Sequence, residues 1–286
     1  MVTGDGLSVG IVGLGSAGRR LFRHLSALGV RDFIGWDPVG FPEGAATIGQ
    51  ARSLDDVVQC RPDIIAICSP AKWHQVQVHE VVTRAHANLR ALFIEKPLAT
   101  SRELLMTSWF EDAGIPIVMG YNRRFHPAIA ALERGRPFKQ AEFWIVADLA
   151  SWPGTAYGDA IAECSHEIDL ALWAIGTSTV VGADIDPDLR RARILLDSGI
   201  AKAAIAIDDV RGADEGRGFE VVGADGQGAM KRFGSTDEGI ETSYREMAAH
   251  LIAVAHGARP AVTIHDGIAV MRVIQEAMRC AARVTS

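Results

Sequence analysis

Apolar and polar positions follow one pattern up to about residue 120 and another pattern after it. In the first part, short apolar runs typical of buried strands alternate with longer segments that repeat apolar residues at helical spacing. The runs fall at 7–12, 32–36, 63–68, 91–94 and 116–119, and the helical segments at 17–28, 54–60, 73–87 and 101–113. Strands that alternate with helices predict right-handed crossovers and a parallel, doubly wound sheet. Gly29 and Ser53 stand where a C-cap and an N-cap are expected.

The second part has longer strand-like stretches separated by turn residues. Strands are predicted at 140–149, 191–196, 201–210, 218–222 and 228–233, and helices at 127–133, 167–175, 242–256 and 266–282. This order is typical of an antiparallel meander flanked by helices. We therefore predict a boundary near residue 120, between a first domain over residues 1–120 and a second domain over residues 121–286.

Composition narrows the class of protein. The 286 residues are 48% hydrophobic and 22% charged, with a formal net charge of −6, which gives no electrostatic reason to expect nucleic acid as a partner. No apolar run is long enough to span a membrane, and the polar N-terminus does not resemble a signal peptide. The four cysteines are scattered, so we expect reduced thiols in the cytoplasm and no metal site.

A glycine-rich loop follows the first predicted strand. Gly13, Gly15 and Gly18 form the spacing GxGxxG, with Ser16 and Ala17 between the last two glycines. In this setting the glycines permit a tight turn, close approach of a pyrophosphate and close packing of helix on strand, and the phosphates lie at the helix N-terminus. A glycine turn without a ligand is the alternative.

Asp37 ends the second predicted strand, 19 residues after Gly18. A carboxylate at this place accepts hydrogen bonds from a ribose 2′-hydroxyl and repels a 2′-phosphate, so NAD is favoured over NADP. A plain Asp-Pro turn, formed with Pro38, is the alternative.

Lys96 stands in Glu95-Lys96-Pro97, directly after the apolar run 91–94. In an open parallel sheet, ligands bind at the carboxyl ends of the strands, where these charges are expected. A lysine near a nicotinamide ring could carry the proton that accompanies hydride transfer. The alternative is a surface lysine paired with Glu95.

Several motifs, in order along nearly the whole chain, resemble one family. They are the glycine loop, Ser69-Pro70 with His74, Glu95-Lys96-Pro97-Leu98, the run Tyr121-Asn122-Arg123-Arg124-Phe125-His126-Pro127, and the tail segments 244–260 and 265–267. Together they resemble the glucose–fructose oxidoreductase / inositol dehydrogenase / rhizopine-catabolism (Gfo/Idh/MocA) family.

The resemblance implies an α/β fold, with an N-terminal NAD-binding Rossmann domain over residues 1–120 and a C-terminal α+β domain over residues 121–286 that has an open, mostly antiparallel sheet. It implies that the second domain serves in substrate binding and oligomerisation and that its last helix could pack back on the first domain. It implies NAD(P)-dependent oxidation or reduction of a sugar, cyclitol or nucleotide-sugar substrate. It also implies that Lys96 lies in the active site and that a histidine of the second domain takes part in proton transfer. That histidine is His166, in Glu163-Cys164-Ser165-His166-Glu167-Ile168-Asp169.

Two positions depart from the family pattern. The acid that usually stands four residues before the histidine is Ala162, and Tyr157-Gly158-Asp159-Ala160 replaces the usual glycine triplet. The partner of the histidine therefore stays open between Glu163 and Asp169, each three residues away. We interpret His166 as the acid/base, Lys96 as an oxygen anchor or relay, and one of the two carboxylates as the group that orients the imidazole. A capping or core histidine and a solvated Asp169 are the alternatives.

The remaining candidates line the two expected subsites. Cofactor contacts are expected from Ser69, Pro70, His74 and Glu95, and substrate contacts from Tyr121, Asn122, Arg123, Arg124, Trp152 and Tyr157. His74 could equally be a polar residue at a helix N-terminus, the two arginines could tie the domains together, and the two aromatics could serve in packing.

Two other functions fit the same scaffold. A non-catalytic NAD-binding regulator would not need Lys96 and His166, and an NAD-dependent glycoside-cleaving enzyme would use the redox step only transiently. By analogy with the family, a homo-oligomer is expected.

Overall fold

The computed structural model describes residues 3–41, 47–84, 87–111, 113–151, 159–186, 188, 190–234 and 237–284. The chain forms two compact units. The first comprises Met1–Ala99, Leu104–Asn122 and Tyr244–Asp266, and the second comprises Thr100–Glu103, Arg123–Ser243 and Gly267–Ser286. The chain passes from the first unit to the second between Asn122 and Arg123, close to the predicted boundary at residue 120, and segment 244–266 returns to the first unit. That the boundary separates two independent domains stays a prediction.

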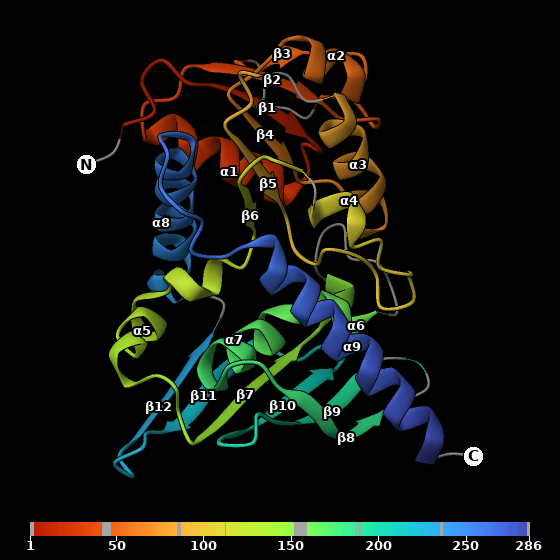
Figure 1. The fold of residues 1–286 in the computed structure, drawn as a ribbon, viewed down its shortest axis with the longest axis vertical. Helices are drawn as coiled ribbons and strands as arrows, with labels where there is room; N and C mark the ends of the chain where they lie inside the picture. Colours follow the sequence, from red (N-terminus) through yellow and green to blue (C-terminus); the bar gives the residue numbers. More distant parts are fainter. Residues whose placement is uncertain are drawn as a thin grey trace. The chain divides into compact units, whose positions relative to one another are not determined.

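The first unit contains a parallel sheet of six strands in the order β3-β2-β1-β4-β5-β6 (Figure 1). The strands are β1 (Ser8–Val12), β2 (Asp32–Trp36), β3 (Gly49–Gln50), β4 (Ile64–Ile67), β5 (Ala91–Ile94) and β6 (Ile117–Met119). The chain runs outward from β1 to β3 and then returns to β4 on the other side of β1. The predicted doubly wound sheet is thus confirmed, with its switch point between β1 and β4.

Helices connect these strands. They are α1 (Ser16–Ala27), α2 (Leu54–Gln59), the short η1 (Ala71–Trp73), α3 (His74–Arg84) and α4 (Ser108–Glu111), and α8 (Glu238–Ala255) joins the unit from Tyr244 on. Both predicted caps are confirmed, because Ser53 Oγ accepts from the N–H of Asp56 at 3.0 Å and Gly29 has φ of +102° just after α1.

The predicted helix 101–113 is wrong over most of its length, since among its described residues only Ser108–Glu111 are helical. The buried side chain of Gln75 explains the difference. Its carboxamide donates to the carbonyl of Leu104 at 3.2 Å and accepts from the N–H of Met106 at 2.8 Å. These backbone groups therefore bond to a distant side chain in place of a helical neighbour.

The second unit contains a mixed sheet of six strands in the order β12-β11-β7-β10-β9-β8, with only β7 and β10 parallel. The strands are β7 (Gln140–Ala147), β8 (Thr179–Ile185), β9 (Arg191–Asp197), β10 (Lys202–Asp209), β11 (Gly216–Val222) and β12 (Gly228–Gly234). The predicted mostly antiparallel sheet is confirmed. The simple meander is wrong in one place, because β7 lies between β10 and β11.

One strand of this sheet has no counterpart in the predicted pattern. In β8 the register shifts between Val180 and Gly182, which breaks the two-residue alternation by which strands are recognised. The shift explains why residues 179–185 do not stand out in the sequence.

One face of this sheet is covered by α7 (Ser165–Ile175), which packs on β7 and β10 (Figure 1). The alternating residues Ala141, Phe143 and Ile145 of β7 are buried. The other helices and turns are η2 (Asn122–Phe125), α5 (Pro127–Ala130), η3 (Glu133–Gly135), η4 (Leu149–Ser151), α6 (Ala160–Glu163) and α9 (Ile264–Val284). The helix α7 begins two residues before the predicted 167, so His166 lies inside its first turn.

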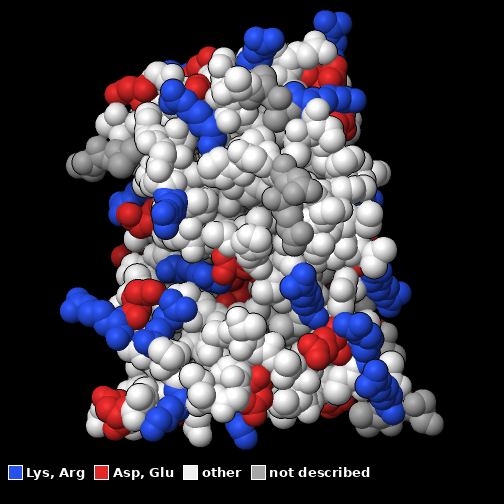
Figure 2. Space-filling model, in the orientation of Figure 1, with Lys and Arg blue, Asp and Glu red and all other residues white. Residues whose placement is uncertain are grey.

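Figure 2 shows Lys and Arg interspersed with Asp and Glu across the face drawn. Among the helices of the described residues, none is long and apolar enough to cross a membrane.

Candidate functional site

The three glycines of the loop after β1 have different surroundings. Gly13 has φ of +89°, and a Cβ there would lie 2.6 Å from the backbone nitrogen of Ser69. A Cβ on Gly18 would lie 2.0 Å from the carbonyl oxygen of Gly13. In contrast, a Cβ on Gly15 would meet nothing within 4 Å. The fold itself thus requires glycine at 13 and 18, whereas Gly15 leaves space beside the loop into which a ligand can come.

The N-terminus of α1 borders this space. Its N-cap is Gly15, which has no side chain to bond the first N–H groups, and the first turn holds no acidic residue. Exposed N–H groups at a helix N-terminus, together with the helix dipole, attract a phosphate or pyrophosphate. The loop and α1 therefore fit the phosphates of a dinucleotide.

Asp37 is held against the same loop. Its carboxylate accepts from the N–H of Leu14 at 2.7 Å through Oδ2 and from the N–H of Val39 at 2.9 Å through Oδ1. Because a carboxylate oxygen can accept more than one hydrogen bond, both oxygens keep the capacity to bind hydroxyl groups. The carbonyl of Asp37 also accepts from Gly40 at 3.1 Å, so the residue forms a turn in addition to facing the loop.

His74 joins the loops that follow β4 and β5. Its Nδ1 lies 2.7 Å from the carbonyl oxygen of Pro97, and its Nε2 lies 2.7 Å from that of Ser69. Carbonyl oxygens only accept, so both contacts are hydrogen bonds only when both ring nitrogens carry a proton. The side chain is fully buried. His74 therefore has a structural position, and a contact with the cofactor stays a prediction.

Glu95 and Lys96 follow β5 at the same edge of the sheet. The backbone N–H of Glu95 donates to Ile67 at 2.8 Å, and both side chains are half-buried. Because the strands are parallel, their carboxyl ends meet at one edge. That edge brings together the predicted residues Gly13, Gly15, Ser16, Ala17, Gly18, Asp37, Ser69, Pro70, His74, Glu95 and Lys96.

Cys68, at the end of β4, is close to this group but is chemically inactive. Burial raises the pKa of its thiol well above the ordinary value, and the charge of Glu95 raises it further. The thiol therefore stays protonated and does not act as a nucleophile.

The second unit carries the remaining acid–base candidates on two short helices. Asp159 caps α6, accepting from Ala162 at 3.3 Å and from Ser101 at 2.8 Å, and burial raises the pKa of its carboxyl. Glu163 ends α6, whereas the buried His166 lies in the first turn of α7. Asp169 therefore lies one helical turn from His166 within α7, whereas Glu163 belongs to a different helix.

Asp169 and Arg124 form a bidentate ion pair. Nε of Arg124 donates to Oδ2 of Asp169 at 2.9 Å, and Nη2 donates to Oδ1 at 2.6 Å. The side chain of Asp169 has no exposed surface, so the alternative of a solvated Asp169 is wrong. Arg123 is also buried, with Nη2 4.0 Å from Glu215.

The other predicted substrate residues are in different situations. Tyr121 and Asn122 are buried. Trp152 and Tyr157 lie outside the described residues. Roles in substrate binding stay predictions for all six candidates.

The sequence did not indicate one buried charge cluster beside His166. Arg217 of β11 donates to Glu167 at 3.2 Å and to Glu215 at 3.0 Å, and its side chain is only 5% exposed. The two partners on α7 and β11 are 50 residues apart along the chain, so no local pattern could connect them. Among the described residues, no group of His, Cys, Asp and Glu side chains is arranged to hold a metal ion.

Solved structures share the fold over nearly the full chain. Levoglucosan dehydrogenase in complex with NADH and levoglucosan has a TM-score of 0.79 at 17% identity, covering 97% of each chain. Apo scyllo-inositol dehydrogenase from Lactobacillus casei has a TM-score of 0.78 at 15% identity, covering 99% of this chain and 98% of that one. GenD2 from gentamicin A biosynthesis in complex with NAD has a TM-score of 0.78 at 17% identity, covering 96% and 94%. No protein-family model and no curated protein sequence matches the chain.

Proposed function

We propose that this protein is an NAD-dependent oxidoreductase of the Gfo/Idh/MocA type. It would transfer a hydride between nicotinamide and a hydroxyl or keto group of a sugar, cyclitol or nucleotide-sugar substrate. The observation that carries the proposal is the edge of the first sheet, where the space beside Gly15, the carboxylate of Asp37 and residue Lys96 follow the carboxyl ends of β1, β2 and β5. The similar folds that bind NAD or NADH support it.

The residues at this edge fit a dinucleotide part by part. The backbone from Gly13 to Gly18 and the N-terminus of α1 would hold the pyrophosphate, and Asp37 would accept from the adenosine ribose. When bound, the cofactor supplies the nicotinamide carbon that accepts or gives the hydride. A negative charge at Asp37 disfavours the extra phosphate of NADP.

The proton of the substrate hydroxyl needs a separate carrier. We propose His166 as the acid/base, because an imidazole titrates near neutral pH, and Lys96 as the group that bonds the substrate oxygen and stabilises its developing charge. Glu163 or Asp169 would orient the imidazole. The ion pair with Arg124 fixes the carboxylate of Asp169 one helical turn from His166.

The substrate side would be lined from the segment that begins at Tyr121. Asn122, Arg123, Arg124, Trp152 and Tyr157 are the proposed contacts, with the guanidinium of Arg124 shared with Asp169. We also propose a cytoplasmic homo-oligomer, by analogy with the family.

A non-catalytic NAD-binding regulator is the second candidate. One observation favours it: the position where the family carries an acid before the histidine is the buried, apolar Ala162. Such a protein would bind NAD and would not depend on His166.

The test is a screen of sugars, cyclitols and nucleotide sugars with NAD, followed by NADH absorbance. On an active substrate, Lys96→Ala and His166→Ala should each lower kcat by about 10²–10⁴-fold, as loss of a proton-transfer group does. Lys202→Ala and His256→Ala, at exposed positions, are the matched controls. Tight NAD binding without NADH from any substrate class would favour the regulator, and full turnover by Lys96→Ala would refute the assigned role of Lys96.

A further inference from the structure

The ring of His74 bridges two loops at the carboxyl edge of the first sheet. Its Nδ1 lies 2.7 Å from the carbonyl oxygen of Pro97, in the loop after β5, and its Nε2 lies 2.7 Å from that of Ser69, in the loop after β4. Pro97 directly follows Lys96. One of the two contacts therefore fixes the backbone next to the proposed oxygen anchor.

The two partner atoms decide the proton state of this ring. A neutral imidazole has one N–H donor and one bare nitrogen that can only accept. Because a carbonyl oxygen also only accepts, a neutral His74 would face one of the two oxygens lone pair to lone pair at 2.7 Å. The imidazolium has a proton for each oxygen, and 2.7 Å is a length expected of a hydrogen bond from a charged donor. The geometry therefore selects the charged ring.

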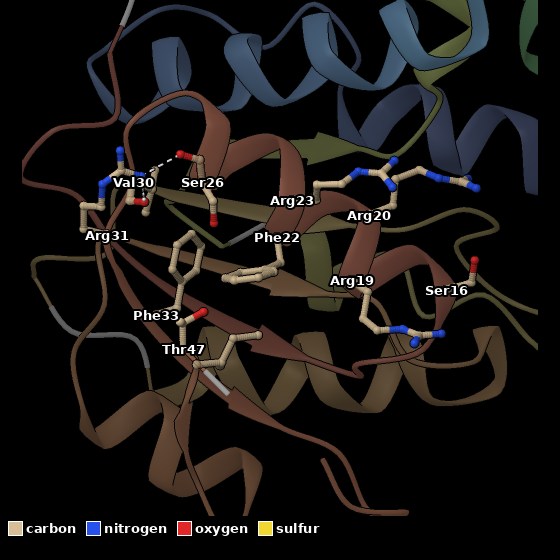
Figure 3. Close-up of a pocket in the computed structure, with 11 residues that line it drawn as sticks. Ser16, Arg19, Arg20, Phe22, Arg23, Ser26, Val30, Arg31, Phe33 and Thr47 are labelled. Atoms are coloured by element: carbon tan, nitrogen blue, oxygen red, sulfur yellow. Dashed lines mark hydrogen bonds between the residues drawn. The ribbon is translucent and has the colours of Figure 1, made fainter. Parts of the chain in front are cut away.

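The contact with Pro97 is sealed from water. The side chain of His74 has no exposed surface, and Pro97 is buried. Figure 3 shows a cavity along α1, with Phe22 and Phe33 in its middle, but none of its described lining residues is Ser69, His74 or Pro97. A ring without a proton on Nδ1 would take from this buried carbonyl the donor that the structure gives it, which is costly.

Two effects oppose a charge on the ring, and Glu95 offsets them. Burial disfavours a charged group, and His74 is the first residue of α3, where the helix dipole disfavours a cation. The carboxylate of Glu95 lies at the same edge, since a Cβ on Gly120 would be 2.5 Å from its Oε2. Burial raises the pKa of the Cys68 thiol, and the charge of Glu95 raises it further. Cys68 precedes Ser69, so this negative charge is felt beside one of the carbonyls that hold the ring.

The remaining ionisable side chains on η1, α3 and α2 have other partners. They are Lys72 against Trp73, His79 against Trp109, Glu80 and Asp55 against Arg84, and Asp56 against Arg52. Among the described residues of these elements and of the loop after β5, Glu95 and Lys96 are the ionisable groups left to act on His74.

We propose that His74 is a buried imidazolium that positions Lys96, because it clamps the loop after β5 to the loop after β4. When the ring loses its second proton at higher pH, one of the two bonds is lost and the loop that carries Lys96 is released. The effect on Lys96 as a reacting group rests on the proposed function, whereas the charge of the ring does not. His74 acts through the backbone of Pro97 and is thus a positioning residue.

Nuclear magnetic resonance counts the protons on the ring. In the full-length protein, isotope-labelled at its histidine nitrogens, the His74 signals are those lost in His74→Asn. Both ring nitrogens should carry a proton at about pH 7.5, where an imidazole of ordinary pKa, about 6.5, is roughly 90% neutral. One protonated and one bare nitrogen at that pH would overturn the proposal. The measurement needs neither NAD nor enzymatic activity.

Two substitutions separate the two bonds. The amide nitrogen of an asparagine takes the place of Nδ1 and can donate to Pro97, whereas that of a glutamine takes the place of Nε2 and can donate to Ser69. Amide hydrogen exchange of segment 95–99 should therefore be roughly tenfold faster in His74→Gln than in His74→Asn. His79→Gln, on the same helix, is the control and should exchange like the wild type. Equal exchange in the two His74 variants would refute the clamp, with thermal unfolding recorded to establish that each is folded.

Turnover on a substrate found by the screen tests the effect on Lys96. His74→Gln should lower kcat by roughly 10-fold to 100-fold, as a displaced catalytic group does, and His74→Asn by less than about threefold. A fall of kcat at high pH in the wild type should be absent in His74→Asn, which keeps the bond to Pro97 and does not titrate. Equal kcat in the two variants would refute the positioning of Lys96. A protein inactive on every substrate class would instead refute the proposed function and leave the proton count and the exchange as the tests of the clamp.

Discussion

Arg124 holds both carboxylate oxygens of Asp169, with distances of 2.9 Å from Nε to Oδ2 and 2.6 Å from Nη2 to Oδ1. The pair joins η2 to α7 one turn after His166. The side chain of Asp169 is fully buried and that of Arg124 is only 12% exposed. Water therefore cannot take the place of the lost partner if either residue is removed. The pair therefore fixes the helix that carries the proposed acid/base.

Asp169→Asn should destabilise the protein by about 3–5 kcal/mol, the usual cost of leaving a buried charge without its partner. The free energy of unfolding in urea measures it. The matched control is Asp186→Asn, which breaks the more exposed pair with Arg191 and should cost much less stability, because water screens exposed ion pairs. Equal and small effects of the two changes would show that the Arg124 pair contributes little.

The features that the sequence predicted are those encoded locally. The glycine loop, Asp37 and Glu95-Lys96 each follow a short apolar run, and a parallel sheet brings the ends of such runs to one edge. The fold class follows from the same alternation of strands and helices. These inferences depend only on residues that lie close together in the sequence.

The features that the sequence did not predict depend on partners far apart in the chain. Gln75 takes the backbone of Leu104 and Met106 out of a helix that local propensity favours. Arg217 reaches Glu167 across 50 residues. The strand β7 likewise pairs with β10, about 60 residues further along the chain, and with β11, about 75 residues further along. The entropy cost of closing such long loops changes only slowly with their length, so it does not indicate which strands pair.

Two glycines of the loop should separate cofactor binding from folding. Gly15→Ala adds a methyl group in open space at a backbone conformation that alanine tolerates, so the protein should keep its stability and bind NAD at least tenfold more weakly. Gly18→Ala places a Cβ against the carbonyl of Gly13 and should lower the thermal midpoint even without ligand. Calorimetry with NAD and thermal unfolding provide the two readouts. A Gly15→Ala protein that binds NAD normally would contradict the proposed position of the pyrophosphate.

The charge of Asp37 should set the choice of cofactor. Asp37→Asn keeps an oxygen that can accept from the N–H of Leu14 but removes the repulsion of a 2′-phosphate. The ratio of NADP to NAD affinity, measured by calorimetry, should rise at least tenfold, which corresponds to about 1.4 kcal/mol. Asp32→Asn, at the opposite end of the same strand, is the control and should leave the ratio unchanged. If the ratio does not move in Asp37→Asn, the ribose lies elsewhere.

His250 should make stability depend on pH in a defined direction. Its Nε2 accepts from the backbone N–H of Ala261 at 2.8 Å, and burial lowers the pKa of the imidazole below its ordinary 6.5. The unfolded chain therefore binds more protons than the folded chain between the folded pKa and 6.5, so stability is complete above 6.5 and is lost as the pH falls through that window. Burial lowers the pKa of His126 as well, so it contributes in the same direction.

His250→Gln tests this linkage, because a glutamine oxygen can accept from Ala261 without titrating. Urea unfolding between about pH 5.5 and 7.5 should show a smaller loss of stability on acidification in this variant than in the wild type. We assign the loss that remains to His126, and adding the change His126→Asn should remove it. His256→Gln, at an exposed position of the same unit, should keep the wild-type dependence. If His250→Gln and the wild type lose stability in parallel as the pH falls, the bond to Ala261 does not require a neutral His250.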